Sequence, residues 1–103
     1  MNQKSQENVE PILNILSEMM PQIKEEFFVS YLGLFGSYAR NEQTLNSDVD
    51  LLVDFNKPVG FEFFNLKSYL EEKLQKNVDL VTRNALKERL RETILNEVKK
   101  IEE

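Results

Sequence analysis

The 103-residue chain contains no cysteine and no histidine. The lack of cysteine excludes disulfides, thiol chemistry and thiolate-ligated zinc or iron–sulfur sites, and the lack of histidine removes the commonest transition-metal ligand. Any bound metal must therefore be a hard cation with oxygen ligands, such as magnesium. No apolar run is long enough to span a bilayer, and the N-terminal MNQKSQENVE is polar where a signal peptide is hydrophobic. We therefore expect a cytoplasmic protein with no membrane partner.

Positive charge is also scarce, because 13 Lys and Arg residues stand against 18 Asp and Glu residues and the net charge is −5. This balance argues against a broad phosphate-neutralising surface, so direct binding to nucleic acid is not expected. A nucleotide bound through a metal ion remains compatible, because the cation supplies the positive charge. The chain has no internal repeat, low-complexity tract or linker, so we expect residues 1–103 to form one domain.

Hydrophobic periodicity in the first half predicts a helix and two strands. The helix begins at about Val9, with Asn8 as candidate N-cap, and Pro21 is expected to end or kink it. The apolar residues that define its buried face are Ile12, Leu13, Leu16, Met19, Met20 and Ile23. Buried strands are predicted in FFVSYLGLFG, residues 27–36, and in SDVDLLVDF, residues 47–55, with a short helix from Ser37 to about Gln43 between them.

The second half predicts a helix, a strand and a helix. Residues 61–77 carry Phe61, Phe64, Leu66 or Leu70, and Leu74 at roughly helical spacing. VDLVTR, residues 78–83, is a short strand. The remainder is amphipathic, with Asn84 as candidate N-cap and an apolar stripe of Leu86, Leu90, Ile94, Val98 and Ile101. This order predicts an α+β, two-layer domain in which helices pack on one face of a small mixed β-sheet.

Acidic residues and a glycine turn in this framework suggest metal–phosphate chemistry. Alternation along the second strand puts Val49, Leu51 and Val53 on one face, and Asp48, Asp50, Leu52 and Asp54 on the other. A divalent cation between Asp48 and Asp50 relieves their repulsion. Asp79 adds a third carboxylate if its strand pairs beside the second one, which is enough ligation for one or two magnesium ions. Gly36 lets the backbone approach a phosphate closely, and Ser37 offers a hydroxyl donor at the start of the predicted short helix.

Two other residues near this site, Arg40 and Tyr38, each have two possible roles. Arg40 is either a further phosphate contact or a partner in an ion pair with a nearby carboxylate. Tyr38 either packs in the core or stacks on a base. Asp54 lies further along the strand than the paired aspartates, so we leave it out of the site. The structural alternatives are that the three aspartates are solvated residues on an open sheet face, and that Gly36 and Ser37 form only a strand-to-helix turn with a cap.

The residues that carry a family resemblance are Gly36, Ser37, Arg40, Ser47, Asp48, Asp50 and Asp79. Together they resemble the signature of the polymerase-β-type nucleotidyltransferases, and in particular of the minimal nucleotidyltransferase (MNT) proteins, over roughly residues 30–83. The resemblance implies a nucleotidyltransferase-like fold in which Gly36, Ser37, Arg40 and Ser47 bind the nucleotide. It implies that the three aspartates bind magnesium, and that Asp79 helps to activate the attacking hydroxyl. Asn41 departs from the glycine of many relatives, but asparagine tolerates left-handed backbone angles.

The same resemblance implies a partner protein. Small MNT proteins act as antitoxins that transfer AMP from ATP to a tyrosine of a helical HEPN-type ribonuclease toxin, and we expect this metal-dependent reaction here. Larger members of the family carry a further domain for the acceptor, so we expect the acceptor site to lie on another molecule or subunit. Two alternatives stay open: a binding module that neutralises its partner by contact alone, and a small-molecule nucleotidyltransferase that acts as an oligomer.

Overall fold

The computed structural model of the protein describes residues 9–103, so the predicted N-cap Asn8 lies outside the described residues. The elements in chain order are α1 (Glu10–Phe27), β1 (Val29–Phe35), β2 (Val49–Phe55), α2 (Phe61–Leu74), β3 (Val78–Thr82), the 3-10 helix η1 (Arg83–Ala85), α3 (Glu88–Glu97) and β4 (Lys99–Lys100). They form a mixed four-stranded sheet with helices, which confirms the predicted α+β class. Among the helices of residues 9–103, none has the length and apolar composition that crossing a membrane requires.

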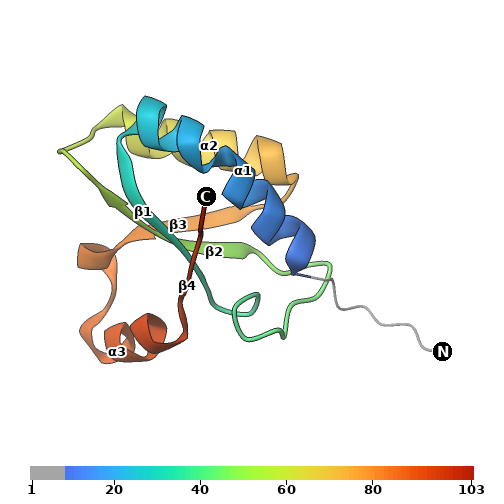
Figure 1. Cartoon of the computed structure of the whole chain (residues 1–103). Coiled ribbons are helices and arrows are strands. Elements are labelled where there is room, and N and C mark those ends of the chain that lie inside the picture. The colour runs from blue at the N-terminus through green and yellow to red at the C-terminus, as the bar shows by residue number, and fades with distance from the viewer. Residues whose placement is uncertain (1–8) are drawn as a thin grey trace.

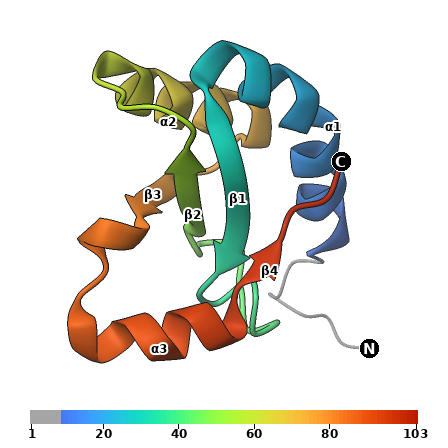
Figure 2. The same cartoon turned by 60° about the vertical axis from the view of Figure 1, so that its left-hand side comes forward.

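The sheet has the strand order β3-β2-β1-β4. β2 runs antiparallel to β1 and parallel to β3, and the short β4 adds antiparallel to the free side of β1. Figure 1 shows α1 and α2 above the sheet and α3 below it, so the helices do not all pack on one face as the sequence predicted. The turned view in Figure 2 shows β4 leading from the end of α3 along β1. The C-terminal segment is therefore built into the sheet.

Alternation along the strands separates two apolar clusters on opposite faces of the sheet. Val49, Leu51 and Val53 of β2 belong to the larger cluster, which α1 and α2 cover. Leu52 points the other way and packs with Phe35 and Leu86, as the predicted alternation requires. The α3 helix lies against this second cluster, but none of its ten residues, all within the described part of the chain, is buried. α3 is therefore held less firmly than α1 or α2.

Two local features of the first half differ from expectation. Of the two outcomes expected for Pro21, an end of α1 is excluded, because the helix continues to Phe27 with Met20 and Ile23 on either side of the proline buried in the core. The segment from Ser37 to Gln43 is not a helix but a succession of turns. Asn41 has a φ of 60°, and a residue in this left-handed conformation stops helical propagation after about one turn.

The C-terminal segment also differs from its prediction. Asn84 lies inside η1 and does not cap the last helix, whose N-cap is Lys87. Val98 is extended and ends α3, so the predicted stripe does not continue as a helix. Ile101 instead enters the larger core cluster, and its backbone N–H donates to the Leu32 carbonyl at 2.9 Å. The open hydrogen-bonding edge of β1 is thus covered by β4, which a helical pattern in the sequence does not reveal.

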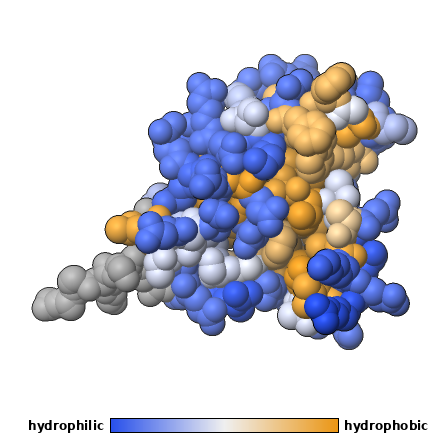
Figure 3. Space-filling view, turned by 180° about the vertical axis from the view of Figure 1, so that it is seen from behind, coloured by the Kyte–Doolittle hydropathy of each residue, from blue (hydrophilic) through white to orange (hydrophobic). Residues whose placement is uncertain are grey.

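Phe61 and Phe64 were expected on the buried side of α2, but they are 83% and 63% exposed. The buried stripe consists of Leu66, Leu70 and Leu74. At about 100° per residue, Phe64 lies about 200° around the helix from Leu66 and so faces solvent. Figure 3 shows that hydrophobic residues form a continuous band with hydrophilic margins on one face of the molecule. The exposed large hydrophobic side chains of the described residues are Leu45, Phe61, Phe64 and Leu90.

Candidate functional site

Asp50 lies at the centre of the predicted site. The parallel register of β2 and β3 pairs Asp50 with Asp79, while the antiparallel register of β1 and β2 pairs it with Phe35. Because paired residues project from the same face of a sheet, Asp50 and Asp79 lie side by side on the face opposite the larger core cluster. The strand pairing on which the predicted third carboxylate depended is therefore confirmed. Asp48 comes just before β2 and is exposed, like Asp79.

Burial raises the pKa of the Asp50 carboxyl to about 6, and the neighbouring charges of Asp79 and then Asp48 add to this rise. Arg40 acts in the opposite direction. A partly buried carboxylate with two like charges beside it is electrostatically unfavourable at neutral pH. A divalent cation would reverse this balance, because it attracts all three carboxylates at once.

The donor set at this position fits a hard cation, since it consists of carboxylate oxygens alone. Within residues 9–103, no three acidic side chains stand close enough together to hold a metal ion as they are. Asp48 and Asp79 are exposed, so their side chains can turn toward the more confined Asp50 at little cost. The three aspartates therefore fit magnesium as ligands that gather around the ion.

Gly36 follows β1 directly and touches the Asp50 side chain. Its φ is +76°, in the left-handed region that favours glycine. A Cβ atom at this position would stand 2.0 Å from Asp50 Oδ2 and 2.9 Å from Asp50 Cγ. Glycine is thus required here both for its backbone angle and for the space that the Asp50 carboxylate occupies. The turn and the acidic cluster form one site.

Gly36 and Arg40 together bind a carboxylate from the far end of the chain. The Gly36 backbone N–H donates to Glu97 Oε2 at 2.9 Å, and Arg40 Nη1 lies 3.2 Å from both Glu97 oxygens. Arg40 Nε donates to Glu42 Oε1 at 3.0 Å. Hydrogen bonds to Glu42 and then to Glu97 raise the pKa of Arg40. Of the two roles left open for Arg40, the structure shows the ion pair.

Glu97 is the residue of this site that the sequence reasoning missed. It belongs to the last turn of α3 and lies 61 positions from Gly36 and 57 from Arg40 in the sequence. No spacing rule connects residues so far apart, and Glu97 sits among other charged residues of an amphipathic helix. Only the packing of α3 under the sheet brings its carboxylate to the glycine turn.

The remaining predicted residues have structural contacts of their own. Ser47 Oγ accepts a hydrogen bond from the Thr44 N–H at 2.9 Å and so closes the turn before Asp48. The Ser37 backbone carbonyl accepts a hydrogen bond from the Glu42 N–H at 2.8 Å. The Ser37 side chain is half-buried, and Ser37 follows Gly36 directly in the chain. Tyr38 is fully buried in the larger cluster, which favours packing over base stacking.

Asp54, which the sequence analysis left out of the site, is engaged elsewhere. Its Oδ2 atom accepts a hydrogen bond from Arg83 Nε at 2.8 Å. Arg83 also lies over the Tyr31 ring, with 4.9 Å from the guanidinium carbon to the ring centroid. Asp54 therefore belongs to a structural cluster that joins β2 to η1.

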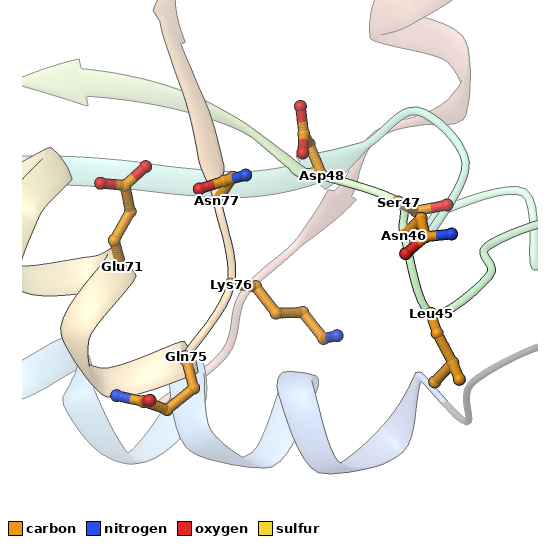
Figure 4. Close-up of a pocket in the computed structure, with 8 residues that line it drawn as sticks. All are labelled: Leu45, Asn46, Ser47, Asp48, Glu71, Gln75, Lys76 and Asn77. Carbon is orange, nitrogen blue, oxygen red and sulfur yellow. The ribbon is translucent and has the colours of Figure 1, made fainter.

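A pocket of about 460 Å³ opens beside Asp48. Figure 4 shows its walls, which come from the loop before β2, from Glu71 in α2 and from the segment between α2 and β3. The lining residues are Leu45, Asn46, Ser47, Asp48, Glu71, Gln75, Lys76 and Asn77. This lining is mostly polar, with one lysine and two carboxylates. The volume is comparable to that of small-molecule sites in general, so a polar ligand could lie against Asp48 here.

Comparison with known proteins bears directly on this arrangement. The family model described as "Nucleotidyltransferase domain" matches residues 10–101. The protein adenylyltransferase MntA of Thermococcus cleftensis is 43% identical over 91 residues, which span 87% of this chain and 92% of the relative. A solved structure reported as a minimal nucleotidyltransferase matches with a TM-score of 0.77 and 32% identity, over 93% of this chain and 98% of the other. A toxin–antitoxin crystal structure with AMP-PNP matches with a TM-score of 0.64 and 25% identity, over 92% of this chain and 73% of the other.

Proposed function

The chain belongs to the nucleotidyltransferase domain family, and we propose a specific reaction for it. It transfers AMP from ATP to a tyrosine hydroxyl of a helical HEPN-type toxin and so acts as the antitoxin of that toxin. The observation that carries the proposal is the position of Asp50. This carboxylate lies between Asp79 on β3 and the Gly36 turn after β1, with Asp48 two residues away. Acidic groups next to an anion-binding turn are what a metal–triphosphate complex requires.

Asp48, Asp50 and Asp79 would hold the magnesium ions. Magnesium held by these residues would supply positive charge to the phosphates and to the oxygens of an in-line displacement. The raised pKa of Asp50 supports this role, because its carboxylate gains most from a nearby cation. The reaction forms a bond from the acceptor oxygen to the α-phosphorus and breaks the bond to pyrophosphate. We assign the acceptor proton to Asp79, which is exposed on the outer strand of the sheet where a partner can approach.

Gly36, Ser37, Arg40 and Ser47 would hold the nucleotide. The Gly36 N–H and the Arg40 guanidinium already act together on one carboxylate, so the same two donors can bind a phosphate. The hydroxyls of Ser37, next to Gly36, and of Ser47, next to Asp48, are further hydrogen-bond donors. Ser47 also lines the pocket beside Asp48, which offers space for the sugar and base.

A protein acceptor is supported by the relatives. The Thermococcus relative is named a protein adenylyltransferase, and one structural neighbour is a toxin–antitoxin complex that contains an ATP analogue. At 43% identity over most of both chains, the first of these is close enough for the acceptor class to carry over as a proposal. The exposed outer strand β3 and the open pocket beside it are consistent with an acceptor that arrives on a separate protein.

The proposal is tested by incubating the protein with magnesium, labelled ATP and the toxin candidate encoded next to it. Three proteins are compared: the wild type, the Asp48→Ala, Asp50→Ala double variant, and Asp54→Asn as a matched control on the same strand. We expect the wild type and the control to add AMP to the partner, as seen by intact-protein mass, and the double variant to add none. Loss of the label after Tyr→Phe replacement in the partner identifies the acceptor residue.

Other outcomes favour the alternatives. A stable complex in which the double variant neutralises the partner as well as the wild type, with no transferred AMP, would indicate a contact-only antitoxin. Transfer to a small hydroxylated compound, with no label on the partner protein, would indicate a small-molecule transferase.

A further inference from the structure

The Glu97 carboxylate is held by a backbone N–H and by a guanidinium. Three polar contacts converge on it: the Gly36 N–H at 2.9 Å and Arg40 Nη1 at 3.2 Å from each of its two oxygens. The Glu97 side chain is only 17% exposed, whereas that of Arg40 is 46% exposed. A backbone N–H at a glycine turn and a guanidinium are the donors that also recognise phosphate oxygens. The Glu97 carboxylate therefore occupies donors of the kind that also bind phosphate.

The position of Glu97 is fixed by the residues that follow it. Val98 packs so closely on β1 that a Cβ atom on Gly33 would stand 2.5 Å from Val98 Cγ2. Lys99 and Lys100 then pair with Leu34 and Gly33 as β4. These contacts deliver Glu97 to the glycine turn whenever β4 is in place. Release of the carboxylate needs no movement of this backbone, because the Glu97 side chain can turn away from the donors by rotation about its own bonds.

We propose that Glu97 is an internal competitor of the nucleotide: its carboxylate occupies the phosphate-binding donors of Gly36 and Arg40, and the triphosphate must displace it in order to bind. The inference rests on the proposed function, which makes these donors a triphosphate site. Displacement leaves Arg40 with Glu42 as its remaining carboxylate partner and frees Nη1 for the phosphate. A retained Glu97 would instead place a negative charge against the bound triphosphate, and such a like-charge contact opposes binding.

Competition has a functional consequence. The donors of the glycine turn are satisfied in the nucleotide-free protein, so the turn is held in shape rather than left to collapse. Ligands with a single weak negative charge gain little by replacing a carboxylate that is already tethered. A triphosphate, with several charges, gains more. Glu97 thus selects for highly charged ligands, which makes it a specificity-determining residue.

The test compares the wild type with Glu97→Gln, which keeps the size and the hydrogen-bond acceptor of the side chain but removes its charge. Glu92→Gln removes the same charge from an exposed position of the same helix and serves as the matched control. The probe is tripolyphosphate, which lacks base and sugar and so reports on the anion-binding groups alone. Calorimetry gives its dissociation constant, and the Gly36 amide resonance in a nitrogen–proton correlation spectrum reports the contact directly.

We expect Glu97→Gln to bind tripolyphosphate about two- to fivefold more tightly than the wild type, the range that one half-exposed ion pair contributes to an equilibrium. Glu92→Gln should bind like the wild type. The Gly36 amide of the wild type should shift on titration with tripolyphosphate. Equal binding by Glu97→Gln and the wild type overturns the competition, and so does absence of binding by both. Weaker binding by Glu97→Gln overturns it too, because Glu97 would then position Arg40 for the ligand.

The AMP-transfer assay on the same samples separates this inference from the proposed function. Transfer by the wild type with equal tripolyphosphate binding by Glu97→Gln rejects the competition and leaves the transferase standing. Tighter binding by Glu97→Gln with no transfer by any variant supports the competition and rejects the transferase.

Discussion

Replacing Asp50 with asparagine should stabilise the metal-free protein. Asparagine has the shape of aspartate but carries no charge, so it removes the cost of holding a carboxylate that is partly buried and lies beside Asp79 and Asp48. A residue proposed to bind metal is thus expected to weaken the fold when no metal is added. The same clustering of acidic groups that would favour metal binding therefore lowers the stability of the metal-free fold.

The magnitude follows from the pKa of Asp50, which rises from 3.8 to about 6 on folding. One pKa unit corresponds to about 1.4 kcal/mol, so the upper limit of the penalty is about 3 kcal/mol. Asp50 retains some contact with solvent, and screening reduces this value to about 1–2 kcal/mol. Between the two pKa values the folded state holds more protons than the unfolded state. The stability that protonated Asp50 provides is therefore present below about pH 4 and is lost as the pH rises through about 6.

Urea unfolding followed by circular dichroism, with a chelator present, measures this effect. Asp50→Asn should raise the free energy of unfolding by about 1–2 kcal/mol near pH 7.5, and the gain should disappear near pH 4. Asp54→Asn is the control, since it makes the same chemical change four residues along but removes the ion pair with Arg83. It should lower stability slightly, by about 0.5 kcal/mol. A loss of stability in Asp50→Asn near pH 7.5 would refute the reasoning.

Four further outcomes are expected. Magnesium should raise the unfolding midpoint of the wild type but not that of Asp50→Asn in the same urea titration, because only ligands that bind the folded state stabilise it. Gly36→Ala should lower the free energy of unfolding by about 1–3 kcal/mol and abolish tripolyphosphate binding, because φ at this position is +76° and the added Cβ atom meets Asp50 Oδ2. Wild-type stability of this variant would contradict the close packing. Ile101→Ala should lower the free energy of unfolding in urea by about 2–4 kcal/mol, because Ile101 is a core residue, and wild-type stability of this variant would contradict its burial. Phe64→Ser should lower stability by no more than about 1 kcal/mol, since this ring is mostly exposed and its edge-on contact with Phe63 is what the change removes.

The sequence predicted the fold correctly where the apolar pattern of one helix or strand is enough to assign its buried face. Alternation in β2 assigns Val49, Leu51 and Val53 to one face and Leu52 to the other, and both assignments are correct. The failures occur where distant residues decide. Packing of α1 outweighs the helix-breaking tendency of Pro21, and pairing with β1 draws the chain after α3 out of its helical pattern. β4 has only two residues, which is too short for a periodic pattern that would predict a strand.

The site divides in the same way. The acidic cluster could be anticipated, because Asp48 and Asp50 share a strand face and one further assumption, the pairing of β2 with β3, adds Asp79. The turn after β1 could be anticipated as a close approach, but not as a succession of turns with Asn41 in the left-handed region. Glu97 could not be anticipated, since its role depends on the length of η1 and α3 and on the register of β4.

The charges of the site explain why one ligand suits both of its halves. Asp48, Asp50 and Asp79 present acceptors to a cation, while Gly36 and Arg40 present donors to an anion, and the Gly36–Asp50 contact joins the two groups. A magnesium–triphosphate complex carries both charges in one ligand. Binding of either component should therefore strengthen binding of the other, because the cation relieves the carboxylates and the anion displaces Glu97. The acidic net charge of the chain, −5, does not oppose such a ligand, since its metal ion offsets much of the phosphate charge.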